Sequence, residues 1–233
     1  MDNQEKTLVI DALSSGLVWQ SSAISFSVPT SGSTWAYSAE SNHAAYGVLS
    51  ATQTSAFRAT LQAWDDVIAA NFYEIQEPQA SGQVRVAFTD VGGVEPGYAY
   101  YPSNLPQGGD IWLDDSLKSA AFTPGSYSYF ILLHELGHVL GLKHPHEASG
   151  NSTTLLPLPL DDMRHTVMSY REQPNRYILD FYVNEAGDLA YKAIPVYASS
   201  PMWMCWRCRR FMVWMPPRVP AMTSTVGTAV KHY

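Results

Sequence analysis

The segment that most constrains this fold is residues 134–144, which read H-E-x-x-H-x-x-G-x-x-H. On a helix, His134 and His138 are one turn apart, so both imidazoles project from one face. The helix can end at Gly141, because glycine tolerates the left-handed conformation that reverses the chain. That reversal would bring His144 back beside the two helical histidines. The pattern therefore predicts three imidazoles around one point.

Three gathered imidazoles predict a zinc site, because neutral imidazole is a good zinc ligand. We predict that His134, His138 and His144 bind one Zn²⁺ ion. Three protein ligands leave a coordination position open, which is typical of a catalytic site and not of a structural one. The carboxylate of Glu135 can reach a water on the metal without being a ligand. We therefore predict a catalytic role for Glu135.

The alternative is a buried helix whose histidines fall at this spacing by chance. The apolar neighbours of the histidines would suit such a helix in any protein, and a bare H-E-x-x-H is only moderately specific. The glycine and third histidine at fixed offsets favour the zinc interpretation. A thermolysin-like site with glutamate as third ligand is disfavoured because His144 supplies a third imidazole at this offset.

Length and composition favour a globular domain. The 233 residues suffice for one large domain or two small ones, and 46% apolar residues support a core. No apolar run reaches the roughly 18 residues of a membrane span. Residues 1–6 lack a basic region followed by an apolar run, so no Sec-type signal peptide is visible. We interpret residues 1–20, which show little periodicity, as a leader or pro-segment.

The charges are distributed unevenly. All 21 acidic residues precede residue 201, whereas residues 201–233 hold five basic residues and no acidic ones. The acidic main body is a poor candidate for binding nucleic acid. Both cysteines, Cys205 and Cys208, lie in the tail, so no disulfide framework holds the main body.

Hydrophobic periodicity predicts a mixed α/β (α+β) fold. Alternation predicts strands at residues 23–29 and 84–88, and a third strand at 110–115, at a sheet edge. A capping box at Ser50 begins an amphipathic helix that extends to about Asn71. We expect the zinc helix to start near Ser126 or Ser128, and we interpret 30–47, 91–109 and 145–159 as loops.

The zinc motif, together with Val167-Met168-Ser169-Tyr170, resembles the metzincin metalloproteases of peptidase family M10. Within them, His144-Pro145 and Gly109-Asp110-Ile111-Trp112 resemble the serralysin group. The resemblance implies a two-lobed catalytic domain over residues 21–200, with a twisted mixed sheet, two long helices and a Met-turn in the lower lobe. It implies that an edge strand pairs with an extended peptide substrate. We assign that strand to Asp110, Ile111, Trp112 and Leu113.

The resemblance also implies roles for individual residues. Met168 would pack beneath the ligating imidazoles as structural support. Gly141 would also have a structural role, as the residue where the helix ends. Tyr170 matches a tyrosine that can be an additional zinc ligand in the resting enzyme and then stabilises the oxyanion. The alternative is a buried tyrosine bonded to a backbone carbonyl. We interpret His146 as a solvent-exposed loop residue, although the loop could bring it near the site, and His43, His165 and His232 as structural or surface residues.

The implied function is a secreted zinc-dependent endopeptidase that hydrolyses extended protein or peptide substrates. A zinc-activated water would attack, with Glu135 as general base and Tyr170 on the oxyanion. We expect a monomer that binds neither nucleic acid nor membrane. Ca²⁺ is compatible with the resemblance, but the glycine-rich calcium repeats and the export signal of serralysins do not occur in this sequence.

The tail, residues 201–233, departs from the family. It holds five of the eight Met, three of the seven Trp and both Cys. In a shifted reading frame its codons can encode Asp-Val-Leu-Ala-Leu-Gln-Ala-Leu-Tyr-Gly, which resembles the helix closing serralysin catalytic domains. We interpret the tail as frameshifted near residue 202 and not as native structure. The alternative function is therefore a catalytically impaired, truncated product that binds zinc or peptide without turnover.

Overall fold

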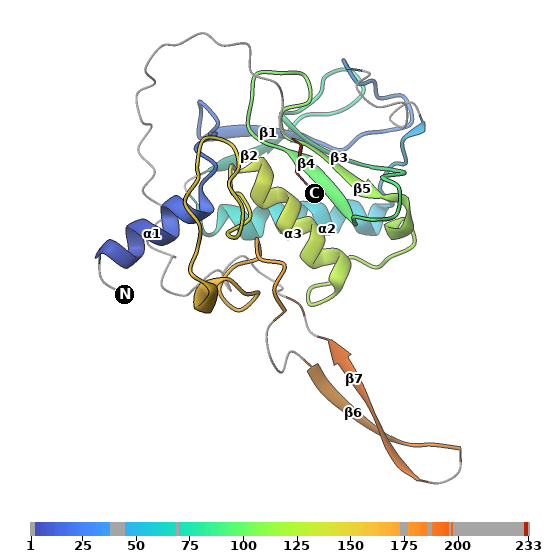
Figure 1. The fold of residues 1–233 in the computed structure, drawn as a ribbon. Helices are drawn as coiled ribbons and strands as arrows, with labels where there is room; N and C mark the ends of the chain where they lie inside the picture. The colour runs from blue at the N-terminus through green and yellow to red at the C-terminus, as the bar shows by residue number, and fades with distance from the viewer. Residues whose placement is uncertain are drawn as a thin grey trace.

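The computed structural model of the chain describes residues 3–37, 45–68, 70–172, 177–185, 188–195, 197 and 231–232. Figure 1 shows a sheet with two long helices packed side by side against one face. The helices are α2 (Ala51–Asp65) and α3 (Tyr127–Val139). The predicted mixed α/β class is confirmed. The strands of the sheet are β1 (Ala23–Ser27), β2 (Asn71–Glu74), β3 (Val84–Thr89), β4 (Gly97–Tyr100), β5 (Asp110–Asp114) and β8 (Lys231–His232).

The sheet is mixed, with the strand order β2-β1-β3-β5-β4-β8. Strands β2, β1, β3 and β5 run parallel, and β4 is antiparallel to β5 and β8. Val86 of β3 lies opposite Ile111 of β5, and Tyr98 of β4 lies opposite Trp112. The predicted strands at 23–29 and 84–88 are present as β1 and β3. Strands β2 and β4 were not predicted.

The prediction that Asp110, Ile111, Trp112 and Leu113 form an edge strand is wrong. Strand β5 pairs with β3 on one side and with β4 on the other. Successive side chains alternate between the two faces. Ile111 and Leu113 belong to the core under the helices, and Trp112 belongs to an aromatic cluster with Tyr98 and Tyr100. Both faces of β5 are buried, so its partial alternation of polar and apolar residues does not indicate an edge strand with one face in solvent.

Helix α2 begins as predicted and ends earlier. Ser50 Oγ accepts a hydrogen bond from the Gln53 amide, and the Gln53 side chain accepts one from the Ser50 amide. Its buried face carries Phe57, Leu61 and Trp64. The helix ends at Asp65 and not near Asn71, because the chain turns to pair β2 with β1.

Helix α3 is buried at every position from Ser128 to Val139, whereas its first residue, Tyr127, is exposed. Its N-cap is Ser126, whose hydroxyl accepts a hydrogen bond from the Tyr129 amide. Trp64 Nε1 of α2 donates to the Leu133 carbonyl 3.2 Å away, which ties the two helices together. After α3, Gly141 has a φ of +94°, the left-handed conformation expected at this position. A Cβ atom there would collide with the Leu17 carbonyl.

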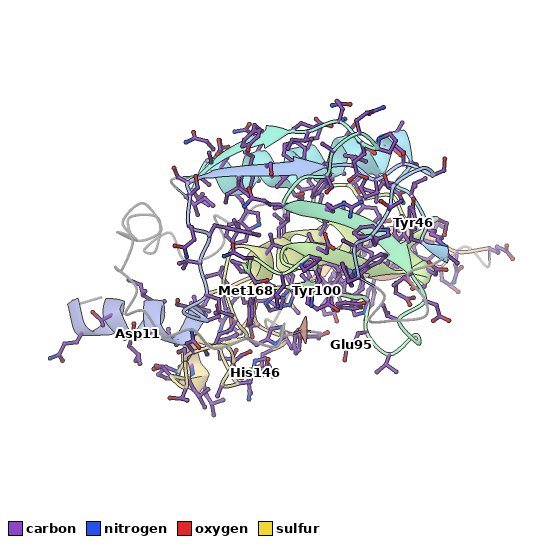
Figure 2. All side chains as sticks on the ribbon, turned by 90° about the horizontal axis from the view of Figure 1, so that it is seen from above. Asp11, Tyr46, Glu95, Tyr100, His146 and Met168 are labelled. Carbon is purple, nitrogen blue, oxygen red and sulfur yellow. The ribbon has the colours of Figure 1, made fainter. Side chains whose placement is uncertain are left out.

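The described part of the predicted leader, residues 3–20, contains a helix. Helix α1 (Asn3–Leu13) buries Val9, Ala12 and Leu13 in the main core. The next residues bond to the end of the zinc motif: the Ser15 amide donates to the Gly141 carbonyl at 2.9 Å. In Figure 2, Asp11 marks α1, which lies beside the loop that carries His146. Whether the segment is removed during processing stays a prediction.

The remaining described elements are two short helical turns and a hairpin. Short 3-10 helices η2 (Asp115–Leu117) and η3 (Leu158–Leu160) interrupt the loops. Strands β6 (Tyr177–Val183) and β7 (Leu189–Pro195) form a separate antiparallel hairpin, which projects away from the sheet in Figure 1. Residues 198–230, with Cys205 and Cys208, lie outside the described residues, as does His43. Among those described, no helix is long and apolar enough to cross a membrane.

Candidate active site

The three predicted histidine ligands converge. His134 Nε2 and His138 Nε2 each lie 3.0 Å from His144 Nε2. All three residues are at most 2% exposed. His134 and His138 lie on successive turns of α3, and the reversal at Gly141 returns His144 to them. The structure therefore brings together residues that the sequence separates by ten positions.

Each imidazole is oriented by an acceptor at its other nitrogen. His134 Nδ1 lies 2.7 Å from the Val167 carbonyl, and His138 Nδ1 lies 2.8 Å from the Leu142 carbonyl. His144 Nδ1 lies 2.7 Å from a carboxylate oxygen of Glu147. Because these acceptors require a proton on Nδ1, all three Nε2 lone pairs face one another. A bound cation would relieve their repulsion, and an all-imidazole donor set with this convergence fits zinc.

Glu135 is buried beside this cluster and is only 1% exposed. Its Oε2 atom has no hydrogen-bond partner among the described residues. Burial raises the pKa of its carboxyl well above the ordinary value, and the charge of Glu95 adds to this effect. Figure 2 places Glu95 in the loop before β4. A buried carboxyl with an unsatisfied oxygen and a raised pKa is suited to accepting a proton.

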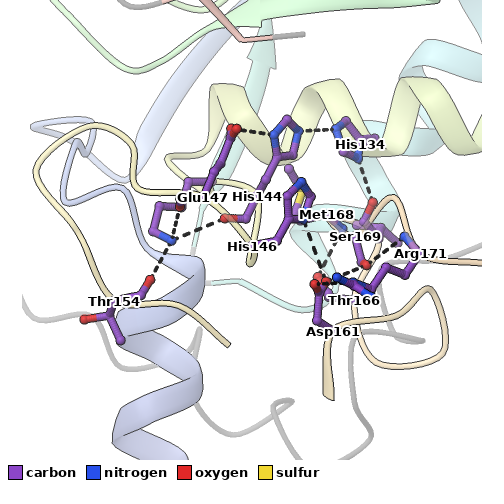
Figure 3. A network of polar contacts seen from close by, with 12 residues as sticks. His134, His144, His146, Glu147, Thr154, Asp161, Thr166, Met168, Ser169 and Arg171 are labelled. Atoms are coloured by element: carbon purple, nitrogen blue, oxygen red, sulfur yellow. Dashed lines mark hydrogen bonds and ion pairs between the residues drawn. The ribbon is translucent and has the colours of Figure 1, made fainter. Parts of the chain in front are cut away.

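Met168 lies under α3, in the turn that the sequence predicts as a Met-turn, and is fully buried. A Cβ atom at Gly137 would collide with its sulfur. The turn is fixed by hydrogen bonds from the Met168 amide to Thr166 Oγ1 and from Ser169 Oγ to Asp161, at 3.1 and 2.7 Å. These contacts hold the Val167 carbonyl against His134 (Figure 3).

Tyr170 packs against the imidazoles. Its ring centroid lies 4.3 Å from that of His144 and 5.5 Å from that of His134. Burial raises its pKa, and the charges of Glu135, Glu95 and Glu147 act in the same direction. The hydroxyl therefore keeps its proton at neutral pH and can donate a hydrogen bond. The residue is nevertheless 46% exposed, so it borders both the metal ligands and solvent.

The interpretation of His146 as a solvent-exposed loop residue is wrong. Its ring lies parallel to that of His144, with centroids 5.5 Å apart, and 5.2 Å from the ring of Tyr170. Its Nδ1 atom is buried, 3.8 Å from a carboxylate oxygen of Asp161. The loop after the zinc motif folds back, which is the alternative that the sequence left open.

Sequence reasoning missed three polar residues that support the site: Lys143, Glu147 and Asp161. Each lies in or after the zinc motif. Asp161 is buried and accepts hydrogen bonds from Ser169 and Arg171 (Figure 3). The sequence offered only one indication of these three residues, namely that each is a charged residue in or near the zinc motif. That signal is weak, because most such residues are solvated.

Comparison with known proteins assigns the part of the chain that contains the zinc motif to a known family. A sequence model for the matrixin family, peptidase M10, matches residues 30–151, just over half of the chain. Similar proteins include serralysin of Proteus mirabilis, 30% identical over 135 residues, and metalloprotease AprA of Pseudomonas entomophila, 33% identical over 126 residues. Macrophage metalloelastase of Rattus norvegicus is 31% identical over 96 residues.

These matches cover 50%, 49% and 38% of this chain, and only 28%, 25% and 20% of the respective relatives. The chain thus spans about a quarter of the length of the curated relatives it matches. The matched family region contains α2, the sheet strands β2 to β5 and the complete zinc motif. With the convergence of His134, His138 and His144, this establishes that the chain belongs to the M10 family of metzincin metallopeptidases.

Proposed function

We propose that this chain carries the catalytic domain of a secreted, zinc-dependent endopeptidase acting on extended proteins or peptides. The observation that carries the proposal is the meeting of three buried Nε2 atoms beside the buried carboxyl of Glu135. Secretion is proposed from the similarity to the serralysin relatives.

The residues divide the chemistry between them. Zinc held by His134, His138 and His144 would polarise the scissile carbonyl and lower the pKa of the attacking water towards ~7. Glu135 accepts the proton of that water and returns it to the leaving amine. Tyr170 donates a hydrogen bond to the carbonyl oxygen as negative charge develops there. The buried surroundings strengthen both interactions, because little water screens them.

A casein-cleavage assay with zinc, comparing the wild-type chain with Glu135→Gln, tests the proposal. Glu135→Gln should keep one zinc per chain and lose cleavage by about 10²-fold or more. Glu185→Gln, an exposed residue at the tip of the β6–β7 hairpin, makes the same charge change as a control and should cleave normally. Near-normal cleavage by Glu135→Gln would refute the assignment.

The second candidate is an impaired product that binds zinc or peptide without turnover. The abrupt change of composition after residue 200 favours it. One bound zinc per wild-type chain without casein cleavage supports this candidate. Cleavage that disappears in Glu135→Gln excludes it and shows that the tail is tolerated.

A further inference from the structure

The third histidine ligand differs from the first two in what holds it. His134 and His138 are fixed by α3 and by backbone carbonyls at their Nδ1 atoms. His144 follows the chain reversal and belongs to no helix. Its Nδ1 atom instead meets a side chain, the carboxylate of Glu147, at 2.7 Å. The loop ligand is thus the one whose orientation depends on a charged neighbour.

Glu147 is itself held in place by a buried lysine. Lys143 is fully buried, and its Nζ donates to the carbonyl oxygens of His144, Glu147 and Thr154 at 3.2, 2.9 and 2.8 Å (Figure 3). One ammonium group therefore holds both ends of the His144–Glu147 pair and the far side of the loop. The Glu147 carboxylate is aimed at the imidazole by a fixed backbone, although its side chain is 43% exposed.

A carboxylate at this position has a defined effect on a metal ligand. It accepts the Nδ1 proton, fixes the tautomer that presents Nε2, and makes Nε2 a stronger donor. Its negative charge also favours a nearby dication. Removing such a partner typically weakens metal affinity 10- to 100-fold. Backbone carbonyls at the other two histidines supply orientation without a full charge.

We propose that Glu147, anchored by Lys143, is a positioning residue that orients His144 and strengthens zinc binding. This inference rests on the zinc site of the proposed function. It does not require turnover, because its direct consequence is an equilibrium constant for zinc. Glu147 contacts the ligand and not the reacting atoms.

The test measures zinc dissociation constants by competition with a chromophoric chelator for wild type, Glu147→Ala, Glu147→Gln and Glu185→Gln. Glu147→Ala should bind zinc about 10- to 100-fold more weakly. Glu147→Gln keeps an acceptor without the charge and should fall between Glu147→Ala and wild type. Glu185→Gln should match wild type. The zinc-free melting temperatures of all four proteins should agree, since the role concerns the metal.

Zinc affinity of Glu147→Ala within twofold of wild type would overturn the inference. Equal weakening in Glu185→Gln would also overturn it, because a remote charge would then suffice. A wild-type chain that binds no zinc would remove the proposed metal site and this inference together. Wild-type zinc binding without casein cleavage would weaken only the proposed activity and leave the zinc measurements decisive.

Discussion

The sulfur of Met168 occupies the space that a side chain at Gly137 would need. Gly137 lies between the two helical ligands, and Met168 is the fully buried methionine of the turn beneath them. Gly137 and Met168 therefore pack as a pair, because the thioether of Met168 fills the space that the missing side chain of Gly137 leaves. This contact sets how closely the turn, and the Val167 carbonyl that orients His134, can approach α3.

A double-mutant cycle tests this packing. Gly137→Ala should destabilise the zinc-free protein by about 1–3 kcal/mol, because the added methyl overpacks the contact. Met168→Ala should cost about 2–5 kcal/mol through the cavity it leaves. The double variant should be more stable than the sum of the two losses predicts, since the cavity accommodates the methyl. Urea unfolding measures all three, and additive losses would contradict the contact.

Tyr170→Phe tests the hydroxyl that we place on the developing oxyanion. The ring packing against His134 and His144 is kept, so zinc content and melting temperature should match wild type. Loss of one such donor typically lowers kcat about 10²- to 10³-fold. Steady-state cleavage of an unstructured peptide separates kcat from KM. An unchanged kcat would assign Tyr170 to packing alone.

The buried carboxyl of Asp110 should make the stability of the fold depend on pH. Burial raises its pKa to about 8, while a 2.7 Å hydrogen bond from Tyr37 and the charge of Arg85 act in the opposite direction. An unfolded aspartate titrates near ~3.9, so between roughly pH 4 and pH 8 the folded state holds a proton that the unfolded state has released. This contribution is full at low pH and is lost as pH rises, at up to about 1.4 kcal/mol per pH unit.

The measurement compares wild type with Asp110→Asn by urea unfolding at pH 5 and pH 8. Asparagine keeps an acceptor for Tyr37 and does not titrate. The stability of wild type relative to the variant should therefore fall between the two pH values. An equal difference at both would show that Asp110 is ionised in the fold throughout this range.

Lys143→Met should destabilise the chain before any metal is added. Methionine keeps most of the apolar stem and leaves three carbonyl oxygens without their donor, at a cost of about 1–3 kcal/mol for each that stays buried. Lys118→Met is the matched control, because Lys118 is half-exposed and its pair with Asp115 lies on the surface. Lys118→Met should lower the free energy of unfolding by no more than about 1 kcal/mol. Similar melting temperatures for both variants would show that the three hydrogen bonds of Lys143 do not stabilise the fold.

Local sequence patterns determined the elements whose signals lie within a few residues. The spacing of His134 and His138 on a helix, the cap at Ser50 and the alternation in β1 and β3 need only helix or strand geometry. Gly141 is similar, because its backbone conformation follows from glycine itself. The predictions of these elements agree with the structure for that reason.

Only the tertiary structure decided which partners these elements meet. It placed β5 inside the sheet, made residues 97–100 the strand β4, and packed α1 against the zinc motif. It also brought Glu147 to His144 and folded His146 back towards Tyr170. Burial on both faces of a strand, and contacts between loops, arise from segments far apart in the chain. A local period cannot encode them, because their free energy depends on surfaces that exist only after the chain has folded.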